Sequence, residues 1–305
     1  MRSPKFNGTS HFIARFNQAA VLYRRIGLLS LIATTSLAIR KRLRSRINFS
    51  KFSRKYDQHI IYIAGLGNSG STWMANLCAS LPGFELYSPA NWHQTFQIGE
   101  INEHQLYQNS FNEFSGKLTV VKSHSYGNFE NTDFLKASNL KHLITVRDPR
   151  DVIISQYWYI RRTHHHIDHQ LAAKQSLPEY ITQKLESGSF EKTTLSWIRG
   201  WLQNRDQQRS IIIRYEDMLD DTDTHWKLAL NFLGIKVDEK TIKEIIEMHS
   251  FEKKTGRKSG QADTLSTQRI GITGEWKSVF SDEHKHLFSQ CGEDVIKSLG
   301  YEPTF

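Results

Sequence analysis

The sequence predicts an α/β fold: a mainly parallel central sheet with helices on both faces. Short apolar, β-branched runs alternate along the chain with segments of helical periodicity, which is the pattern of successive βα units. The runs are apolar at nearly every position, as expected for strands that are buried on both faces of a sheet. With 305 residues, of which 38% are hydrophobic, the chain is long enough to bury a large core.

Four strands are predicted, at Ile60–Ala64, Leu118–Lys122, Leu143–Val146 and Ile211–Arg214. Helical patterns lie between and after these strands. Their predicted bounds are Ser71–Ser80, Asp151–Arg161, Leu195–Leu202, Trp226–Leu233, Lys240–Met248 and Glu283–Leu299. We expect the folded part to begin near Gln58, which divides the chain into an N-terminal segment, 1–56, and one domain, 57–305.

The N-terminal segment carries the positive charge of the protein. Residues 1–56 contain 13 Lys and Arg and no Asp or Glu, which leaves 27 basic and 31 acidic residues in 57–305. The net charge of +9 therefore belongs to this segment, and we expect no nucleic-acid-binding face on the folded domain. An anionic partner would bind the N-terminal segment instead.

One apolar stretch, residues 26–39, lies in this segment with basic residues on both sides. As a helix it would be about 21 Å long, which is shorter than a hydrocarbon core of roughly 30 Å. We therefore expect a cytoplasmic protein whose N-terminal segment lies on an anionic membrane surface. A single-pass signal anchor, an Arg-rich organelle transit peptide and a solvated basic leader are the alternatives.

Three other features invite a functional interpretation and receive a simpler one. Cys78 and Cys291 provide neither a disulfide framework nor a metal-ligand spacing, which favours a reducing compartment. The run 161–169 contains four histidines without ordered spacing, and we interpret it as a solvated basic loop that can border a binding site. Trp197 and Trp201, four residues apart on a predicted helix, are expected to pack in the core.

The segment after the first strand has the composition of a phosphate-binding loop. Gly65, Gly67 and Gly70 let the backbone turn so that its N–H groups face an anion, and the following helix adds its N-terminal dipole. The segment is similar to a Walker A loop, with Ser71 where that motif has its lysine. A tight strand-to-helix connection without a ligand is the alternative.

The same segment, Gly65–Trp73, resembles the 5′-phosphosulfate loop of sulfotransferases that use PAPS (3′-phosphoadenosine 5′-phosphosulfate), whose pattern is TYPKSGTTW. Asn68–Trp73 matches the second half of the pattern, including the tryptophan that stacks on adenine in the family. The family lysine, which contacts the bridging oxygen and helps the leaving phosphate depart, falls on Asn68. The resemblance therefore implies a different rate or mechanism at this step.

Two further motifs follow in the family order. Lys122-Ser123-His124 resembles the family K-T-H, which implies His124 as general base and Lys122 as a charge for the sulfuryl oxygens. Residues 143–155 resemble the 3′-phosphate motif, in which Arg147 can direct two donors to a phosphate and Ser155 lies two helical turns on. An Arg–Asp pair that closes a strand-to-helix turn is the alternative explanation for Asp148 and Asp151.

The remaining motifs lie in the C-terminal half. Tyr215 belongs to a YED match that contacts adenine in the family, and residues 249–251 resemble the TSF element, with histidine in place of threonine. Residues 269–277 resemble RKGxxGDWK, although Ile270 replaces a lysine. The family dimerisation motif beyond Lys277 is mostly absent, so a dimer of that kind is not predicted.

Taken with its spacing, the resemblance implies a P-loop-like sulfotransferase that transfers a sulfuryl group from PAPS to an acceptor hydroxyl or amine, without a metal. The implied catalytic group is His124, Lys122 and Asn68. The implied nucleotide site consists of Gly67, Ser69, Gly70, Ser71, Thr72, Trp73, Arg147, Ser155, Tyr215, Phe251, Arg269 and Gly271. The acceptor stays open among small alcohols or phenols, glycans and lipids. A non-catalytic PAP- or PAPS-binding protein and a P-loop nucleotide phosphotransferase are the rival interpretations.

Overall fold

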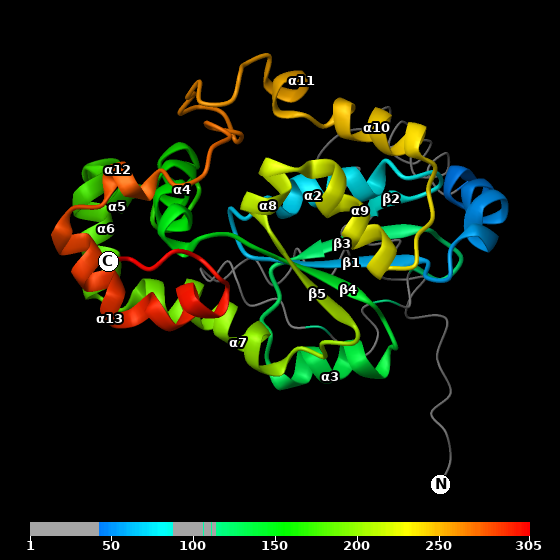
Figure 1. The fold of residues 1–305 in the computed structure, drawn as a ribbon, viewed down its shortest axis with the longest axis horizontal. Helices are drawn as coiled ribbons and strands as arrows, with labels where there is room; N and C mark the ends of the chain where they lie inside the picture. Colours follow the sequence, from blue (N-terminus) through cyan, green and yellow to red (C-terminus); the bar gives the residue numbers. More distant parts are fainter. Residues whose placement is uncertain (1–42, 88–105, 107–110, 112–113) are drawn as a thin grey trace, which may run out of the picture.

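The computed structural model describes residues 43–87, 106, 111 and 114–305. Its centre is a five-stranded sheet, in the order β2-β3-β1-β4-β5, in which every neighbouring pair is parallel (Figure 1). The strands span Glu85–Tyr87 (β2), Thr119–Ser123 (β3), Ile60–Gly65 (β1), His142–Val146 (β4) and Ser210–Arg214 (β5). The predicted α/β fold is confirmed, and the four predicted strands are present; the short edge strand β2 was not predicted.

Helices cover both faces of the sheet, as predicted. On β1, Ile61 and Ile63 face one core cluster, whereas Tyr62 and Ala64 face the other. The first cluster includes residues of α2 (Ser71–Ala79), α9 (Thr222–Phe232) and α10 (Glu239–Met248). In Figure 1 these three helices lie above the sheet and α3 lies below it. Because both faces are buried, an uninterrupted apolar run is the sequence that this strand requires.

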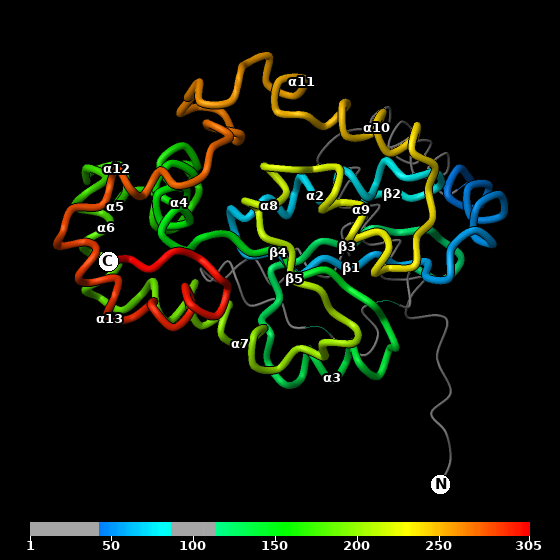
Figure 2. Tube along the Cα trace, in the orientation of Figure 1, coloured from blue at the N-terminus to red at the C-terminus, as the bar shows by residue number. Residues whose placement is uncertain are grey.

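The second cluster is larger and extends beyond the sheet. It includes residues of α3 (Phe129–Ala137), α4 (Pro149–Arg162), α6 (Leu177–Glu186), α7 (Ser196–Asn204) and α13 (Asp282–Ser298). Figure 2 shows α4, α5, α6 and α13 grouped beside the sheet, at the end where β4 leads into α4. The shorter helices are η1 (Ser53–Lys55), α5 (His169–Lys174), the π-helix η5 (Glu191–Leu195), α8 (Tyr215–Asp220), α11 (Phe251–Thr255) and α12 (Trp276–Val279).

The strand order fixes where a ligand can bind. β1 and β4 are neighbours, but the connection from β1 leads toward β2 and that from β4 leads toward β5 on the other side, so a crevice forms outside the carboxyl ends of these strands. The loop after β1 begins at this crevice, and so do the segments that follow β3, β4 and β5. All four motifs that follow predicted strands therefore meet at one edge of the sheet.

Residues 43–56, which the sequence analysis placed in the N-terminal segment, pack on the domain. Residues 43–52 are helical, and Phe49 and Phe52 lie against the core cluster that contains α2. Tyr56 is buried and donates a hydrogen bond to the carbonyl of Pro82 at 3.0 Å. The apolar stretch 26–39 lies outside the described residues. Among the residues that are described, no helix has the length and apolar character to cross a membrane.

Candidate functional site

A cavity of about 960 Å³ opens at the carboxyl edge of the sheet. Every residue of the predicted catalytic group lines it, and so does every residue of the predicted nucleotide site except Ser69. These residues come from the loop after β1, the ends of β3 and β4, and helices α2, α4, α8 and α11, with the segment 269–271. The fold thus brings together motifs that are spread over 200 residues of sequence.

The loop between β1 and α2 requires glycine at two positions. A Cβ on Gly65 would lie 2.3 Å from the Cβ of Ser71, so only glycine allows α2 to begin this close to the strand. Gly70 has φ 75°, and a Cβ there would lie 2.7 Å from Cδ2 of Tyr215. The N-terminus of α2, with the hydroxyls of Ser71 and Thr72, therefore faces the cavity and offers an anion-binding site.

Ser69 has a different role from the one predicted. Its side chain is buried, and its hydroxyl donates to the carbonyls of Leu66 at 2.6 Å and Thr145 at 3.0 Å. Its backbone N–H donates to the Leu66 carbonyl as well. Both donors of Ser69 are thus used inside the loop, so this residue holds the loop against β4 instead of lining the cavity.

Asn68 lines the cavity in a backbone conformation that few residues adopt. Its φ of 63° lies in the left-handed region, where asparagine is enriched among non-glycine residues. Its carbonyl accepts a hydrogen bond from Nη1 of Arg147 at 3.5 Å. The loop after β1 is in this way connected to the residue that follows β4.

Lys122 and His124 are held close to the same loop. Lys122 Nζ donates to Oγ1 of Thr72 at 3.2 Å, and burial lowers the pKa of Lys122. His124 Nδ1 lies 2.5 Å from the carbonyl oxygen of Gly65. Because a carbonyl can only accept, Nδ1 carries the proton, and in the neutral ring Nε2 is the basic nitrogen. This tautomer is the one that a general base acting through Nε2 requires.

Two indole groups fix the backbone at His124. Trp197 Nε1 donates to the His124 carbonyl at 3.1 Å, and Trp201 Nε1 donates to the Ser125 carbonyl at 3.0 Å. Both tryptophans are buried on α7, which confirms their predicted place in the core. They also position the end of β3, a contribution that the sequence analysis did not predict.

Arg147 is directed into the cavity from the end of β4. Its Nη2 donates to the carbonyl of Ile272 at 3.1 Å and forms an ion pair with Asp151 at 3.5 Å. Its guanidinium lies 4.6 Å from the ring centroid of Tyr215. Nε of Arg147 is buried and has no partner among the described residues, and the same holds for the indole Nε1 of Trp73 and of Trp158, which also line the cavity. Buried donors of this kind fit an anionic, polar ligand.

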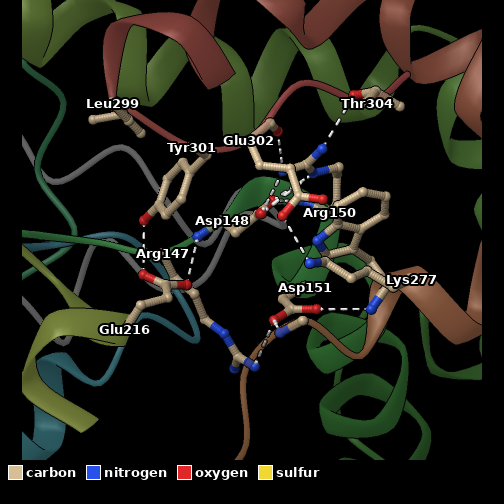
Figure 3. Close-up of polar contacts among 12 residues, drawn as sticks. Arg147, Asp148, Arg150, Asp151, Glu216, Lys277, Leu299, Tyr301, Glu302 and Thr304 are labelled. Carbon is tan, nitrogen blue, oxygen red and sulfur yellow. Dashed lines mark hydrogen bonds and ion pairs between the residues drawn. The ribbon is translucent and has the colours of Figure 1, made fainter. Parts of the chain in front are cut away.

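Asp151 attaches the C-terminal glycine-rich segment to α4. Its carboxylate accepts hydrogen bonds from the backbone N–H groups of Gly274 at 2.7 Å and Trp276 at 2.9 Å. Figure 3 shows Asp151 between Arg147 and this segment. Asp148 caps the N-terminus of α4 through the Arg150 N–H and forms an ion pair with the Arg150 side chain at 2.7 Å. The structural explanation of both aspartates is therefore confirmed.

A partly buried carboxylate, that of Glu216, contacts the backbone of Asp148. Glu216 accepts from the Asp148 N–H at 3.0 Å and from the Tyr301 hydroxyl at 2.7 Å (Figure 3). Burial raises the pKa of Glu216. Arg150 stacks on Trp276, with its guanidinium carbon 3.7 Å from the ring centroid. Both ends of the segment 272–276 are thus attached to the residues that follow β4.

The predicted adenine side consists of aromatic residues from three elements. The ring centroids of Trp73 and Tyr215 are 6.3 Å apart, with an angle of 72° between the ring planes, and Phe251 lines the same cavity. His249, which replaces the family threonine, is buried and shares a hydrogen bond between its Nε2 and the Ser80 hydroxyl at 2.8 Å. Arg269 forms an ion pair with Glu275 and lies 5.6 Å from the Trp158 ring centroid.

One wall of the cavity was predicted only in part, because the run 161–169 was expected to border a binding site but α6 was not predicted. This wall is formed by residues of α4, of α6 and of the segments next to them: Trp158, Tyr159, Arg162, His166, Asp168, Tyr180, Lys184 and Lys192. A signal was present on α4, because positions three, four and seven residues after Ser155 share its helical face. In the segments 43–87 and 114–305 no group of three or more His, Cys, Asp or Glu side chains is placed to hold a metal ion.

Comparisons with known proteins agree with this geometry. A sulfotransferase-domain family model matches residues 57–300 of this chain. The guinea pig (Cavia porcellus) 3-beta-hydroxysteroid sulfotransferase is 24% identical over 177 residues, which are 55% of this chain and 59% of that protein. Mouse (Mus musculus) sulfotransferase 2A6 is 26% identical over 176 residues, with the same two shares. The chain thus spans about 59% of the length of these curated relatives.

A solved structure extends the likeness to the fold. A mouse sulfotransferase in complex with PAP superimposes with a TM-score of 0.57 at 21% identity, covering 83% of this chain and 92% of that chain. At this identity the comparison shows a common fold. The family match, in contrast, extends from the start of β1 to the end of α13 and includes every motif that lines the cavity. This chain belongs to the sulfotransferase family.

Proposed function

We propose that this chain transfers a sulfuryl group from PAPS to a hydroxyl or amine of an acceptor. The observation that carries the proposal is that one cavity is lined by the N-terminus of α2, by the basic residues Lys122 and Arg147, and by His124 in the tautomer that leaves Nε2 basic. The aromatic side chains of Trp73, Tyr215 and Phe251 supply the apolar surface that an adenine needs.

In this proposal each part of the nucleotide has its own partners. The 5′-phosphosulfate binds the N–H groups and hydroxyls at Gly70–Thr72, where the helix dipole favours negative charge. The 3′-phosphate binds Arg147, Ser155 and Arg269, and the segment around Gly271 lies over it. Buried donors that have no partner among the described residues, such as Nε of Arg147, support this assignment.

The transfer step is an in-line displacement at sulfur. PAPS supplies the sulfuryl group and the phosphate that leaves with the electron pair of the broken sulfur–oxygen bond. His124 Nε2 takes the proton of the acceptor group as the new bond to sulfur forms. Lys122 stabilises the negative charge on the sulfuryl oxygens, and its hydrogen bond to Thr72, in the proposed 5′-phosphosulfate loop, supports this role. In this proposal His124 and Lys122 supply the proton transfer and the positive charge, and no metal ion takes part.

We also propose, on the sequence alone, that the N-terminal segment, residues 1–56, binds an anionic membrane surface from the cytoplasmic side. The support is the basic residues around the apolar stretch 26–39. Co-sedimentation with vesicles that contain phosphatidylserine should retain the full chain at low salt, and a chain that begins at residue 43 should stay in solution. Equal behaviour of the two proteins contradicts this part of the proposal.

Calorimetric titration of the full chain with PAP tests the nucleotide site. We expect micromolar binding, and a loss of at least about tenfold in Arg147→Ala, because a charge-assisted hydrogen bond to phosphate contributes about 1.5–3 kcal/mol. Arg209→Ala is the matched control, because Arg209 pairs with Asp206 and does not line the cavity. Binding of ATP with magnesium in place of PAP would favour the phosphotransferase.

Turnover distinguishes the enzyme from a non-catalytic binding protein. With labelled PAPS and a panel of hydroxyl and amine acceptors, wild type should release PAP, and His124→Ala should bind PAP normally but release it at least about a hundredfold more slowly, the usual contribution of a general base. If wild type binds PAP but turns over no acceptor, the result supports a non-catalytic binding protein. Asn68 in place of the family lysine is the observation that favours this rival.

A further inference from the structure

The wall of the cavity that the motifs do not explain has a composition of its own. We call it the α6 wall and define it by Arg162, His166, Asp168, Tyr180, Lys184 and Lys192, all of which line the cavity. It lines the same cavity as His124. Its residues lie at the end of α4, in the segment before α5, on α6 and on η5, whereas the nucleotide motifs lie on other elements or in the first half of α4. The acceptor is the ligand that remains for this wall.

The α6 wall is positively charged in a domain that is not. Residues 57–305 carry 27 basic and 31 acidic residues, yet the wall has three cations and one carboxylate, Asp168. Asp168 pairs with Lys184 at 3.2 Å, which neutralises one of the three. Neither Arg162 nor Lys192 has a carboxylate oxygen within 4.0 Å among the described residues. The wall therefore presents a net positive charge to whatever binds there.

Tyr180 adds a hydrogen-bond donor to the same wall. Its side chain is fully buried on α6, and its hydroxyl has no partner among the described residues. Burial raises the pKa of Tyr180, so the hydroxyl keeps its proton and remains a donor. Lys184 lies one turn later on α6, with Nζ 5.6 Å from the Tyr180 ring centroid. A buried donor without a partner is costly, and a ligand acceptor atom would satisfy it.

An apolar acceptor fits this wall poorly. It would remove water from Arg162 and Lys192 without supplying any group to replace the lost hydrogen bonds, and it would leave the buried Tyr180 hydroxyl without an acceptor. A ligand that carries negative charge satisfies the cations and the hydroxyl together. Sites built to hydrogen-bond a polar group reject analogues that lack it far more strongly than apolar pockets reject small changes.

On the basis of the proposed function, we propose that the acceptor carries an anionic group, a carboxylate, sulfate or phosphate, near the hydroxyl or amine that receives the sulfuryl group. Lys192, Lys184 and Tyr180 bind this anionic group and so direct the nucleophile toward His124. Asp168 opposes the interaction, because it competes for Lys184. The acceptor class thus differs from the hydroxysteroid named for the guinea pig relative.

Matched acceptors test the proposal. Para-hydroxymethylbenzoate, its phosphonate analogue and its neutral methyl ester share one ring and one hydroxyl and differ in the anionic group. Transfer from labelled PAPS by the full chain should give a kcat/KM about tenfold or more higher for an anionic probe than for the ester, as one added charge-assisted hydrogen bond predicts. The carboxylate and phosphonate arms show which anion the wall prefers.

Variants of opposite sign make the test specific. Lys192→Gln and Tyr180→Phe should each lower the ratio of anionic probe to ester about three- to tenfold, whereas Asp168→Asn should raise it, because Lys184 loses its competitor. Lys174→Gln, an exposed lysine of α5 that does not line the cavity, should leave the ratio unchanged. An equal or higher rate with the ester, or shifts of the same sign in Lys192→Gln and Asp168→Asn, overturns the proposal.

Binding separates this proposal from the proposed function. Titration of the full chain with PAP reports on the nucleotide site, and titration with the anionic probe and the ester, with and without PAP, reports on the α6 wall. If the full chain does not bind PAP but still prefers the anionic probe to the ester, the proposed function is wrong and the α6 wall is an anion site of another kind. If the full chain binds PAP but shows no preference between the probes, in binding or in turnover, only the proposal of an anionic acceptor is wrong.

Discussion

Asn68 is a residue at which the rate of reaction and the stability of the fold should respond in opposite directions. It has φ 63°, which asparagine tolerates better than lysine, and the family resemblance places a lysine at this position. We expect Asn68→Lys to raise kcat about tenfold by stabilising the leaving phosphate, equivalent to about 1.4 kcal/mol in the barrier. The same change should lower the free energy of unfolding by about 1 kcal/mol, because a long side chain replaces the asparagine.

Asn68→Gly is the control for this pair of effects. Glycine adopts a positive φ without strain, so the variant should be as stable as wild type or more so, but it adds no charge and should not raise kcat. Single-turnover kinetics with labelled PAPS and chemical unfolding give the two quantities. A kcat for Asn68→Lys no higher than for Asn68→Gly would show that the missing charge does not limit the rate.

His142 should make the stability of the domain depend on pH. It is buried at the start of β4, and this burial lowers its pKa to about 4. In the unfolded chain the pKa is near 6.5, so between these values the unfolded state binds more protons and stability falls as pH falls. We expect the free energy of unfolding to decrease by about 2 kcal/mol between pH 7 and pH 5 from this residue alone.

Urea unfolding of His142→Phe at the two pH values checks this contribution. Phenylalanine keeps an aromatic ring in contact with Tyr62 and Trp201, whose centroids lie 6.1 and 5.7 Å from that of His142. The variant should lose part of the pH dependence and not all of it, because burial also lowers the pKa of His166, His249 and His284. If the free energy of unfolding of His142→Phe depends on pH as strongly as that of wild type, His142 does not contribute to the pH dependence.

Among the elements, the connection between α4 and the segment 269–277 is the one on which the nucleotide site depends. Asp151→Asn keeps one acceptor oxygen but removes the charge that pairs with Arg147 and accepts from Gly274 and Trp276. We expect PAP affinity to fall about tenfold and the free energy of unfolding by about 1–3 kcal/mol, the range for charged hydrogen bonds. Hydrogen exchange at Gly274 and Trp276 should become faster.

Glu302→Gln is the matched control for this connection. Glu302 pairs with Lys277 at 2.7 Å, close to the same segment, but both side chains are more than half exposed. Exposed pairs of this kind contribute about 0–1 kcal/mol. If Glu302→Gln weakens PAP binding as much as Asp151→Asn, the segment responds to its surface charges and not to the buried carboxylate.

Elements with a strong local pattern could be predicted from the sequence, and elements without one could not. α4 was predicted to begin at Asp151, two residues late, because the pattern of apolar residues starts there; Asp148 as cap and Pro149 at the first position are the signals that set the true start. α6 was missed, although Ser176 and Glu179 form a capping box. Ser69 was assigned to the ligand because a hydroxyl in a loop does not reveal which carbonyls it reaches.

At the scale of the whole molecule, the structured part begins before the predicted boundary. Phe49, Phe52 and Tyr56 pack on the core, so a chain that begins at residue 57 should be less stable than one that begins at residue 43. The expected loss is about 3–6 kcal/mol, since full burial of a large apolar side chain contributes about 1.5–3 kcal/mol and Phe49 and Phe52 are only partly buried. Chemical unfolding of the two chains measures it.

Two point variants show whether the added stability comes from packing of the aromatic side chains or only from the longer chain. Phe52→Ala in the chain that begins at residue 43 should reproduce about 3 kcal/mol of the loss. Leu43→Ala, at an end of the helix where the side chain is 55% exposed, should change little. Equal stability of the two truncated chains would show that residues 43–56 are an independent appendage.

The sheet order explains why the site could be predicted better than the domain boundary. Every motif at the end of a predicted strand had to reach the carboxyl edge once the strands were parallel. Phe251, Arg269 and Gly271 follow no strand, yet they too are among the fourteen of fifteen predicted site residues that line one cavity. Of the α6 wall, only the residues in the run 161–169 were expected near a binding site; the others, on α6 and η5, belong to no strand end. They meet the site only through packing between helices, and packing between distant segments leaves no periodic trace in one sequence.

The contact between β3 and α7 has a consequence for how the protein can evolve. A Cβ on Gly127 would lie 2.4 Å from the backbone nitrogen of Trp201, so the chain beyond β3 touches α7 backbone to backbone. The backbone at His124 is therefore held by α7, whereas Tyr180 and Lys184 lie on a different helix, α6. Mutations on α6 can change which acceptors are selected while the proposed base keeps its place. Gly127 is therefore a position at which natural variation should be restricted.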